Sequence, residues 1–165
     1  MAPTYTFLQK NWPRPFSIVG GVVSVDWSHP IPHPVAIADG LFTGGSQPHL
    51  IGERDRETGR IVFPGPDDAE RYEPVPLPRR GRLWSWTIQR FRPKSPPYIG
   101  PEEFEPFAVG YVELPGAVIV EARLANVDFH NLRIGMEMET ILLPFTTDAA
   151  GNSLVTYAFQ PTGGA

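Results

Sequence analysis

The stretch GRLWSWTIQRF, residues 81–91, decides the fold. Its positions alternate between two sets of side chains: Leu83, Ser85, Thr87, Gln89 and Phe91 on one parity, and Trp84, Trp86, Ile88 and Arg90 on the other. Because successive side chains of an extended chain point to opposite faces, this period of two, carried by β-forming residues, predicts a β-strand. The same alternation predicts that Trp84 and Trp86 lie on one face of that strand.

Four more segments downstream have the same character. They are 107–115 (FAVGYVELP), 117–126 (AVIVEARLAN), 132–145 (LRIGMEMETILLPF) and 153–161 (SLVTYAFQP). Pro115-Gly116 supplies a turn between the first two, and a short non-strand link, VDFHN, precedes the third. Five strands in about 80 residues, mostly antiparallel and with one such link, are typical of an OB-fold barrel. A β-sandwich is the alternative, but it usually needs seven or more strands.

Composition divides the chain into three parts. Residues 1–49 form a Pro/Gly-rich N-terminal extension with one β-like run at 16–27, and residues 50–80 are polar and turn-rich. Residues 81–165 carry the predicted barrel. Twenty Pro and sixteen Gly in 165 residues favour turns over long helices, so the sequence predicts a mainly β protein.

Charge and cysteine content exclude several classes of protein. The net charge is −4 and the chain has no cysteine, which rules out disulfides and the usual structural zinc sites. No apolar run reaches the roughly 18 residues that a membrane span needs. The N-terminus lacks the charged-then-apolar layout of a signal peptide. We therefore expect a soluble, cytoplasmic protein with no membrane partner.

The run from Gly52 to Pro161 resembles the family of acyl-CoA-associated proteins that join a rubredoxin-like zinc ribbon to an OB-fold. GERDRETG (52–59) and Phe63-Pro64 fall on the first knuckle of the ribbon, with Asp55 and Thr58 at the thiolate positions. The second cysteine pair would lie near 67–71, where no ligand set survives. The barrel motifs follow the family in order, at 81–91, 106–115, 120–124, 132–139 and 157–161.

The resemblance implies that residues 50–80 are a degenerate, metal-free ribbon-like segment, for which no zinc is expected. Asp and Thr side chains cap their own turns, so local hydrogen bonds can hold the turn instead. The resemblance also implies a partner, because such proteins pair with a thiolase-like enzyme, either a ketoacyl-CoA thiolase or a lipid-transfer-protein-like aldolase. The expected function is that of a non-catalytic accessory subunit in a hetero-oligomer, which helps to form the acyl-CoA channel of the enzyme.

Basic and aromatic residues near the first barrel strand are the candidates for contact with the shared CoA ester. The phosphates of CoA call for Arg or Lys donors, and its adenine for an aromatic or apolar shelf. The candidate ligand-binding residues are Arg79, Arg80, Arg82, Trp84, Trp86, Arg90, Phe91, Lys94 and Tyr98. No catalytic residue is expected in this chain: His29 and His33 lie in a Pro-interrupted segment, and His130 and Asp128 lie in a loop.

Two other functions remain open from the sequence. The chain could work alone as a small-ligand module or enzyme that binds acyl-CoA, with residues 1–49 as an added lid. It could instead bind single-stranded nucleic acid, as many OB-folds do. The negative net charge disfavours the second alternative, as do the acidic residues Glu113, Glu121, Glu137 and Glu139 in the later strands.

Overall fold

The computed structural model describes residues 16–19, 22–25, 35–66, 68–92, 94 and 103–163. Its strands are β1 (Phe16–Val19), β2 (Val22–Val25), β3 (Val35–Ala36), β4 (Ile51–Asp55), β5 (Ile61–Val62), β6 (Tyr72–Pro76), β7 (Arg80–Gln89), β8 (Phe107–Glu113), β9 (Ile119–Leu124), β10 (Glu137–Thr147) and β11 (Ser153–Pro161). They form three sheets, with the orders β1-β2, β5-β4-β6 and β10-β7-β8-β9-β11-β3. No helix long and apolar enough to cross a membrane occurs in this part of the chain.

Strands β7 to β11 close into a barrel. Neighbours β7–β8, β8–β9 and β10–β11 are antiparallel, β10 returns to β7, and β9 lies parallel to β11. The only parallel pair of the five therefore joins the third and fifth strands. The prediction of a five-stranded OB-fold barrel is confirmed.

Glycines allow the barrel strands to approach closely. A Cβ atom at Gly81 would overlap the carbonyl oxygen of Glu113 and would meet the side chains of Val112 and Leu114 at 2.9 Å. At Gly110 it would meet Leu83 at 2.8 Å. The buried core of the barrel includes the side chains of Leu83, Val112, Leu114, Leu124, Met138 and Phe159.

A β-bulge in β7 overturns one prediction from the sequence. Leu83 pairs with Val112 and Ser85 with Tyr111, so Trp84 is an extra residue without a partner on β8. The extra residue shifts the alternation by one position, as such bulges do. Trp84 is 57% exposed, whereas Trp86 packs against the core opposite Gly110. The two tryptophans therefore lie on opposite faces, and the expectation of a shared face was wrong.

The fourth barrel strand begins later than its sequence pattern predicts. The pattern placed the start at residue 132, but β10 starts at Glu137. Gly135 has a φ of 87°, which is a left-handed conformation outside the strand region. Its amide bonds the carbonyl of Leu83, and the Leu83 amide bonds Met136. The apolar residues before Glu137 thus close the barrel as a turn.

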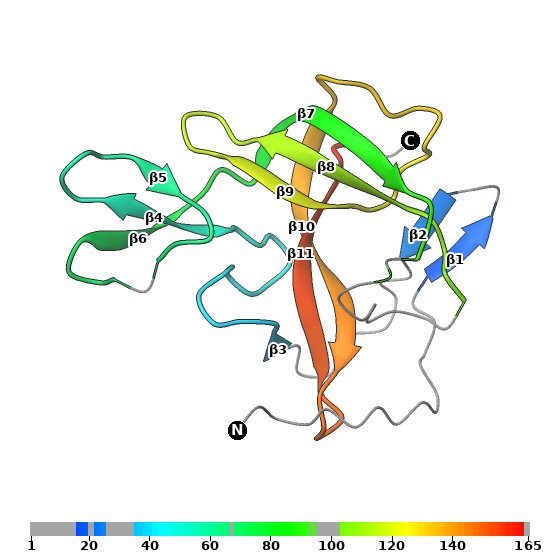
Figure 1. The fold of residues 1–165 in the computed structure, drawn as a ribbon, viewed down its shortest axis with the longest axis horizontal. Helices are drawn as coiled ribbons and strands as arrows, with labels where there is room; N and C mark the ends of the chain where they lie inside the picture. Colours follow the sequence, from blue (N-terminus) through cyan, green and yellow to red (C-terminus); the bar gives the residue numbers. More distant parts are fainter. Residues whose placement is uncertain are drawn as a thin grey trace.

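The small sheet β5-β4-β6 projects from one side of the barrel, on the left in Figure 1. Leu50 and Leu77, at the inner ends of β4 and β6, are fully buried in the same core as the barrel. Phe63, just after β5, meets Tyr157 of β11 edge-on, with ring centroids 5.3 Å apart. The sheet is therefore packed onto the barrel rather than linked to it by chain alone.

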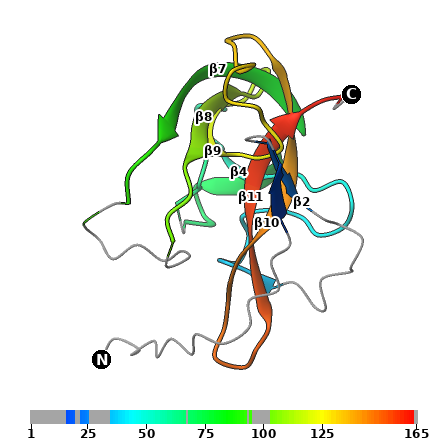
Figure 2. The same ribbon diagram turned by 90° about the vertical axis from the view of Figure 1, so that its right-hand side faces the viewer.

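The β10–β11 hairpin extends beyond the other barrel strands, downward in Figures 1 and 2. Its turn is closed by Asp148, whose carboxylate accepts hydrogen bonds from the amides of Ala150 and Asn152. β3 adds to β11 as a short parallel strand. The predicted β-like run at 16–27 contains the antiparallel pair β1 and β2.

Candidate functional site

The outer face of the barrel carries an exposed aromatic pair. The bulge turns Trp84 outward, where it meets Tyr111 of β8 edge-on with ring centroids 6.4 Å apart. Tyr111 is 42% exposed, and Ile119 of β9 is 41% exposed on the same face. Bulges re-aim side chains, and exposed tryptophan and tyrosine are the residues most enriched at the centres of protein interfaces. These three residues, Trp84, Tyr111 and Ile119, are called the outer aromatic patch below.

Charged residues surround the outer aromatic patch. Tyr111 lies opposite Glu121, and its hydroxyl donates a hydrogen bond to that carboxylate. This bond and the negative charge of Glu121 raise the pKa of Tyr111 above its usual value, because both oppose a phenolate. Arg82 and Glu113 form the neighbouring cross-strand pair. An apolar centre with a charged rim is the usual anatomy of a protein–protein interface.

Arg79 and Arg80, predicted to contact a ligand, pair with a carboxylate of the protein itself. Arg79 Nη1 lies 3.0 Å from Glu139 Oε2, and Arg80 Nε lies 3.8 Å from the same oxygen. Glu139 also accepts a hydrogen bond from Gln160. The Nε of Arg79 is buried and finds no hydrogen-bond partner among the described residues. One of the two positive charges at this end of β7 is therefore compensated within the chain.

The other predicted ligand residues lie elsewhere. Arg90, Phe91 and Lys94 are exposed just beyond the opposite end of β7, which spans ten residues or up to about 30 Å. Trp86 packs against the core, and Tyr98 lies outside the described residues. The structure thus places Arg79 and Arg80 at one end of β7 and Arg90, Phe91 and Lys94 beyond the other, so the candidates do not form one site.

The histidines and the loop aspartate take structural positions where they are described. Asp128 accepts hydrogen bonds from the amide of His130 and the side chain of Asn131, while the His130 side chain is 95% exposed. His49 Nδ1 lies 2.9 Å from the carbonyl oxygen of Leu77, which can only accept, so Nδ1 carries the proton. His29 and His33 lie outside the described residues.

The small sheet β5-β4-β6, called the ribbon-like sheet below, contains a buried carboxylate at a predicted thiolate position. Asp55 is only 4% exposed. Its Oδ1 accepts the amides of Glu57 and Thr58 at 2.9 and 3.0 Å, and its Oδ2 accepts Nε and Nη2 of Arg71 at 2.9 and 2.7 Å. These bonds, led by the one from Thr58 and then by Arg71, lower the pKa of Asp55 from 3.8 to about 2.

This donor set does not fit zinc. Structural zinc takes four ligands, mostly thiolate sulfur or histidine nitrogen. Both oxygens of Asp55 are engaged, and the hydroxyl of Thr58 accepts the amide of Arg60 at 3.3 Å. The second knuckle position holds a guanidinium, that of Arg71, which cannot bind a cation. No group of three or more His, Cys, Asp or Glu residues suited to a metal ion occurs among the described residues.

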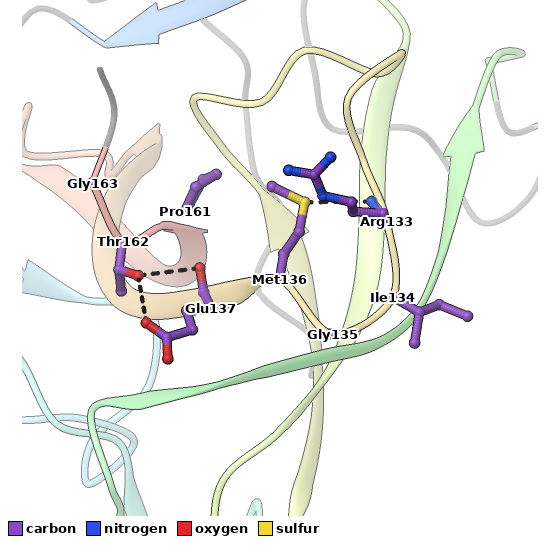
Figure 3. Close-up of a pocket in the computed structure, with 8 residues that line it drawn as sticks. All are labelled: Arg133, Ile134, Gly135, Met136, Glu137, Pro161, Thr162 and Gly163. Atoms are coloured by element: carbon purple, nitrogen blue, oxygen red, sulfur yellow. Dashed lines mark hydrogen bonds between the residues drawn. The ribbon is translucent and has the colours of Figure 1, made fainter.

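An open hollow of about 380 Å³ lies between the turn before β10 and the end of β11 (Figure 3). Its lining residues are Arg133, Ile134, Gly135, Met136, Glu137, Pro161, Thr162 and Gly163. Thr162 Oγ1 lies 3.4 Å from both the carbonyl and the carboxylate of Glu137. None of the residues predicted to bind a ligand lines this hollow, and Ile134 points away from Thr162 in Figure 3.

Two features of these sites escaped the sequence analysis. The contact of Arg71 with Asp55 joins residues 16 positions apart, and no local pattern links them. The outward turn of Trp84 depends on an unpaired residue in β7, which the alternation of β-forming residues conceals. The tyrosine that completes the patch, Tyr111, was part of a predicted strand but was not singled out.

Comparison with known proteins agrees with this fold and shows which proteins the chain is similar to. Residues 74–141 match the family model described as ChsH2, C-terminal OB-fold domain. The benzoylsuccinyl-CoA thiolase subunit BbsA of Thauera aromatica is 29% identical over 122 residues, covering 70% of this chain and 78% of that protein. A DUF35 domain-containing scaffold protein of Pyrococcus furiosus is 29% identical over 121 residues, covering 68% of this chain and 82% of that protein.

A solved structure has the same fold. The structure described as Ltp2-ChsH2(DUF35) aldolase aligns with a TM-score of 0.53 at 20% identity, covering 68% of this chain and 84% of that chain. The match of the barrel strands, the order of the motifs and the two sequence relatives point to one conclusion. Residues 74–141 of this chain are therefore similar to the ChsH2 C-terminal OB-fold domains.

Proposed function

We propose that this protein is a non-catalytic accessory subunit of a thiolase-like enzyme and that it docks through the outer aromatic patch. The observation that carries the proposal is the Trp84–Tyr111 pair, which a bulge turns outward on the barrel. Contiguous exposed apolar patches with a polar rim mark interaction sites. The sequence relatives named as a thiolase subunit and a scaffold protein supply the class of partner.

The subunit would act through its shape and its contacts with the enzyme, and not through chemistry of its own. Bound to the enzyme, it would stabilise the fold of its partner and close part of the acyl-CoA channel. The catalytic nucleophile and base would belong to the enzyme. Whether the partner breaks a carbon–carbon bond as a thiolase or as an aldolase depends on that enzyme, because the accessory chain would contribute surface and positive charge only.

The test is to produce a thiolase-like enzyme of the same organism with and without this chain. We expect the two proteins to co-purify in a fixed ratio, and the enzyme to lose activity and thermal stability when the chain is omitted. Full activity and stability of the enzyme alone, together with no co-purification, would refute the proposal.

We further propose that Arg90 and Lys94 are the residues that offer donors to the CoA phosphates. Both are exposed beyond the end of β7, whereas Arg79 and Arg80 are paired with Glu139. Replacing both Arg90 and Lys94 by Ala should raise the KM for the CoA ester by at least about tenfold in the complex, since each hydrogen bond to a charged group contributes about 1.5–3 kcal/mol. The kcat should change little.

Arg60→Ala is the matched control for this test, because Arg60 is also exposed but lies in the turn of the ribbon-like sheet. It should leave the KM unchanged. Equal KM values for the double variant and the wild type would remove Arg90 and Lys94 from the substrate channel.

A further inference from the structure

Two turns of the ribbon-like sheet are built in the same way. Each begins with an aspartate whose Oδ1 accepts a hydrogen bond from the backbone amide three residues later. Asp55 accepts one from Thr58 at 3.0 Å, and Asp68 accepts one from Arg71 at 3.2 Å. The four positions are thus spaced as two pairs, each pair with two residues between its members. This spacing is the one in which paired cysteines hold structural zinc.

The two turns are joined across their ends. The Arg71 side chain donates from both Nε and Nη2 to Asp55 Oδ2, and the amide of Arg56 donates to the Arg71 carbonyl at 3.0 Å. A guanidinium that binds one carboxylate through two nitrogens fixes direction as well as distance. The Arg71 side chain of the second turn therefore binds Asp55 of the first turn at the place where a metal ion would join the two knuckles.

This contact is stabilising because the Asp55 carboxylate is buried and both of its oxygens accept hydrogen bonds. Asp55 is 4% exposed, so each of its four donors replaces water that the site excludes. Losing the guanidinium would leave a buried charge with only the two amides of its own turn, which is costly. By contrast, the side chains of the nearby pair Arg56 and Glu73 are 50% and 38% exposed, so this pair contributes little.

We propose that the Asp55–Arg71 ion pair takes the place of the metal ion as the cross-link of this sheet, so that residues 50–77 fold without any metal. The cross-link keeps β4 and β6 in position and, with them, the contact of Phe63 on Tyr157 of the barrel. The proposal does not depend on the accessory-subunit function. It makes the sheet insensitive to chelators and to thiol oxidation.

The test compares Arg71→Gln with Arg56→Gln, two arginines of equal exposure on the same sheet, side by side with the wild type. Hydrogen exchange is measured at the amides of Glu57 and Thr58, and metal content is measured with and without a chelator. In Arg71→Gln these amides should exchange at least about tenfold faster, because the turn opens locally, while barrel amides such as Val112 keep their protection. Arg56→Gln should match the wild type.

The wild type should contain no stoichiometric zinc and should unfold at the same temperature with or without the chelator. Zinc bound in a one-to-one ratio, or unfolding by the chelator, would overturn the proposal, as would equal exchange in the two variants. If Arg71→Gln does not yield folded protein, Arg71→Lys and Arg56→Lys replace the two variants. Arg71→Lys must then exchange faster at Thr58, because lysine cannot bind the carboxylate through two nitrogens.

Discussion

Asp55 carries a negative charge into a nearly buried position, where four donors stabilise it. Its pKa falls from 3.8 to about 2, led by the bond from the Thr58 amide. A carboxyl group whose pKa is lower in the folded state stabilises the fold above its unfolded pKa, and loses that stabilisation as the pH falls through the folded pKa. The contribution of Asp55 should therefore be complete above about pH 4 and should disappear toward pH 2.

The prediction concerns the pH dependence of unfolding. Asp55→Asn should lower the melting temperature at pH 7 by several degrees, and the difference from the wild type should shrink steadily between about pH 4 and pH 2. Asp148, whose pKa is lowered chiefly by the side chain of Asn152, titrates in both proteins and cancels in the comparison. A difference in melting temperature that is constant from pH 7 to pH 2 would show that the ionised Asp55 is not the stabilising species.

A substitution at Gly81 tests how closely the strands of the barrel approach each other. A methyl group at this position would overlap the carbonyl oxygen of Glu113, so Gly81→Ala should destabilise the protein by about 1–3 kcal/mol. Gly44→Ala is the control, because nothing lies within 4 Å of the Cβ position there and Gly44 does not have a positive φ. Urea denaturation measures both variants. Similar midpoints for the two would mean that β7 and β8 separate more easily than the structure shows.

At the scale of elements, the β7 bulge divides the two tryptophans between the outside and the core. Trp84→Ser should change the free energy of unfolding by no more than about 0.5 kcal/mol, as surface substitutions usually do. Trp86→Ala should cost about 2–4 kcal/mol, because the side chain packs against the core. Urea denaturation checks both values. A larger loss for Trp84 than for Trp86 would reverse the assignment of faces.

The elements differ in how far the sequence predicts them. The strand at 153–161 was predicted with its observed bounds, because its turn and its Pro161 mark both ends. The bulge at Trp84 cannot be seen in the alternation, because the extra residue lies within a run rich in β-forming residues. The turn before β10 was mistaken for strand because Leu132 and Ile134 are apolar. The Asp55–Arg71 pair depends on the register of β4 against β6, which becomes visible only in the folded chain.

At the scale of the whole molecule, the barrel and the ribbon-like sheet share one core. Leu50 and Leu77 connect the two, and Phe63 packs on Tyr157. The outer aromatic patch lies on β7, β8 and β9, so a partner can cover it without displacing this core. The fold class was predictable because the five strand segments can be recognised in order along the sequence. The patch was not predictable, because it depends on which residues face outward.

The docking of this chain on a thiolase-like enzyme is the central claim, and light scattering after size exclusion tests it directly. The wild-type chain mixed with the enzyme should elute as one hetero-oligomer. The double variant Trp84→Ser/Tyr111→Ser should elute as two separate proteins, because interface aromatics carry much of the binding energy. The control Ile134→Ser, which changes an apolar residue that is 73% exposed outside the patch, should still form the complex. A wild-type chain that elutes alone at every concentration, or a double variant that binds as well as the wild type, would contradict the account.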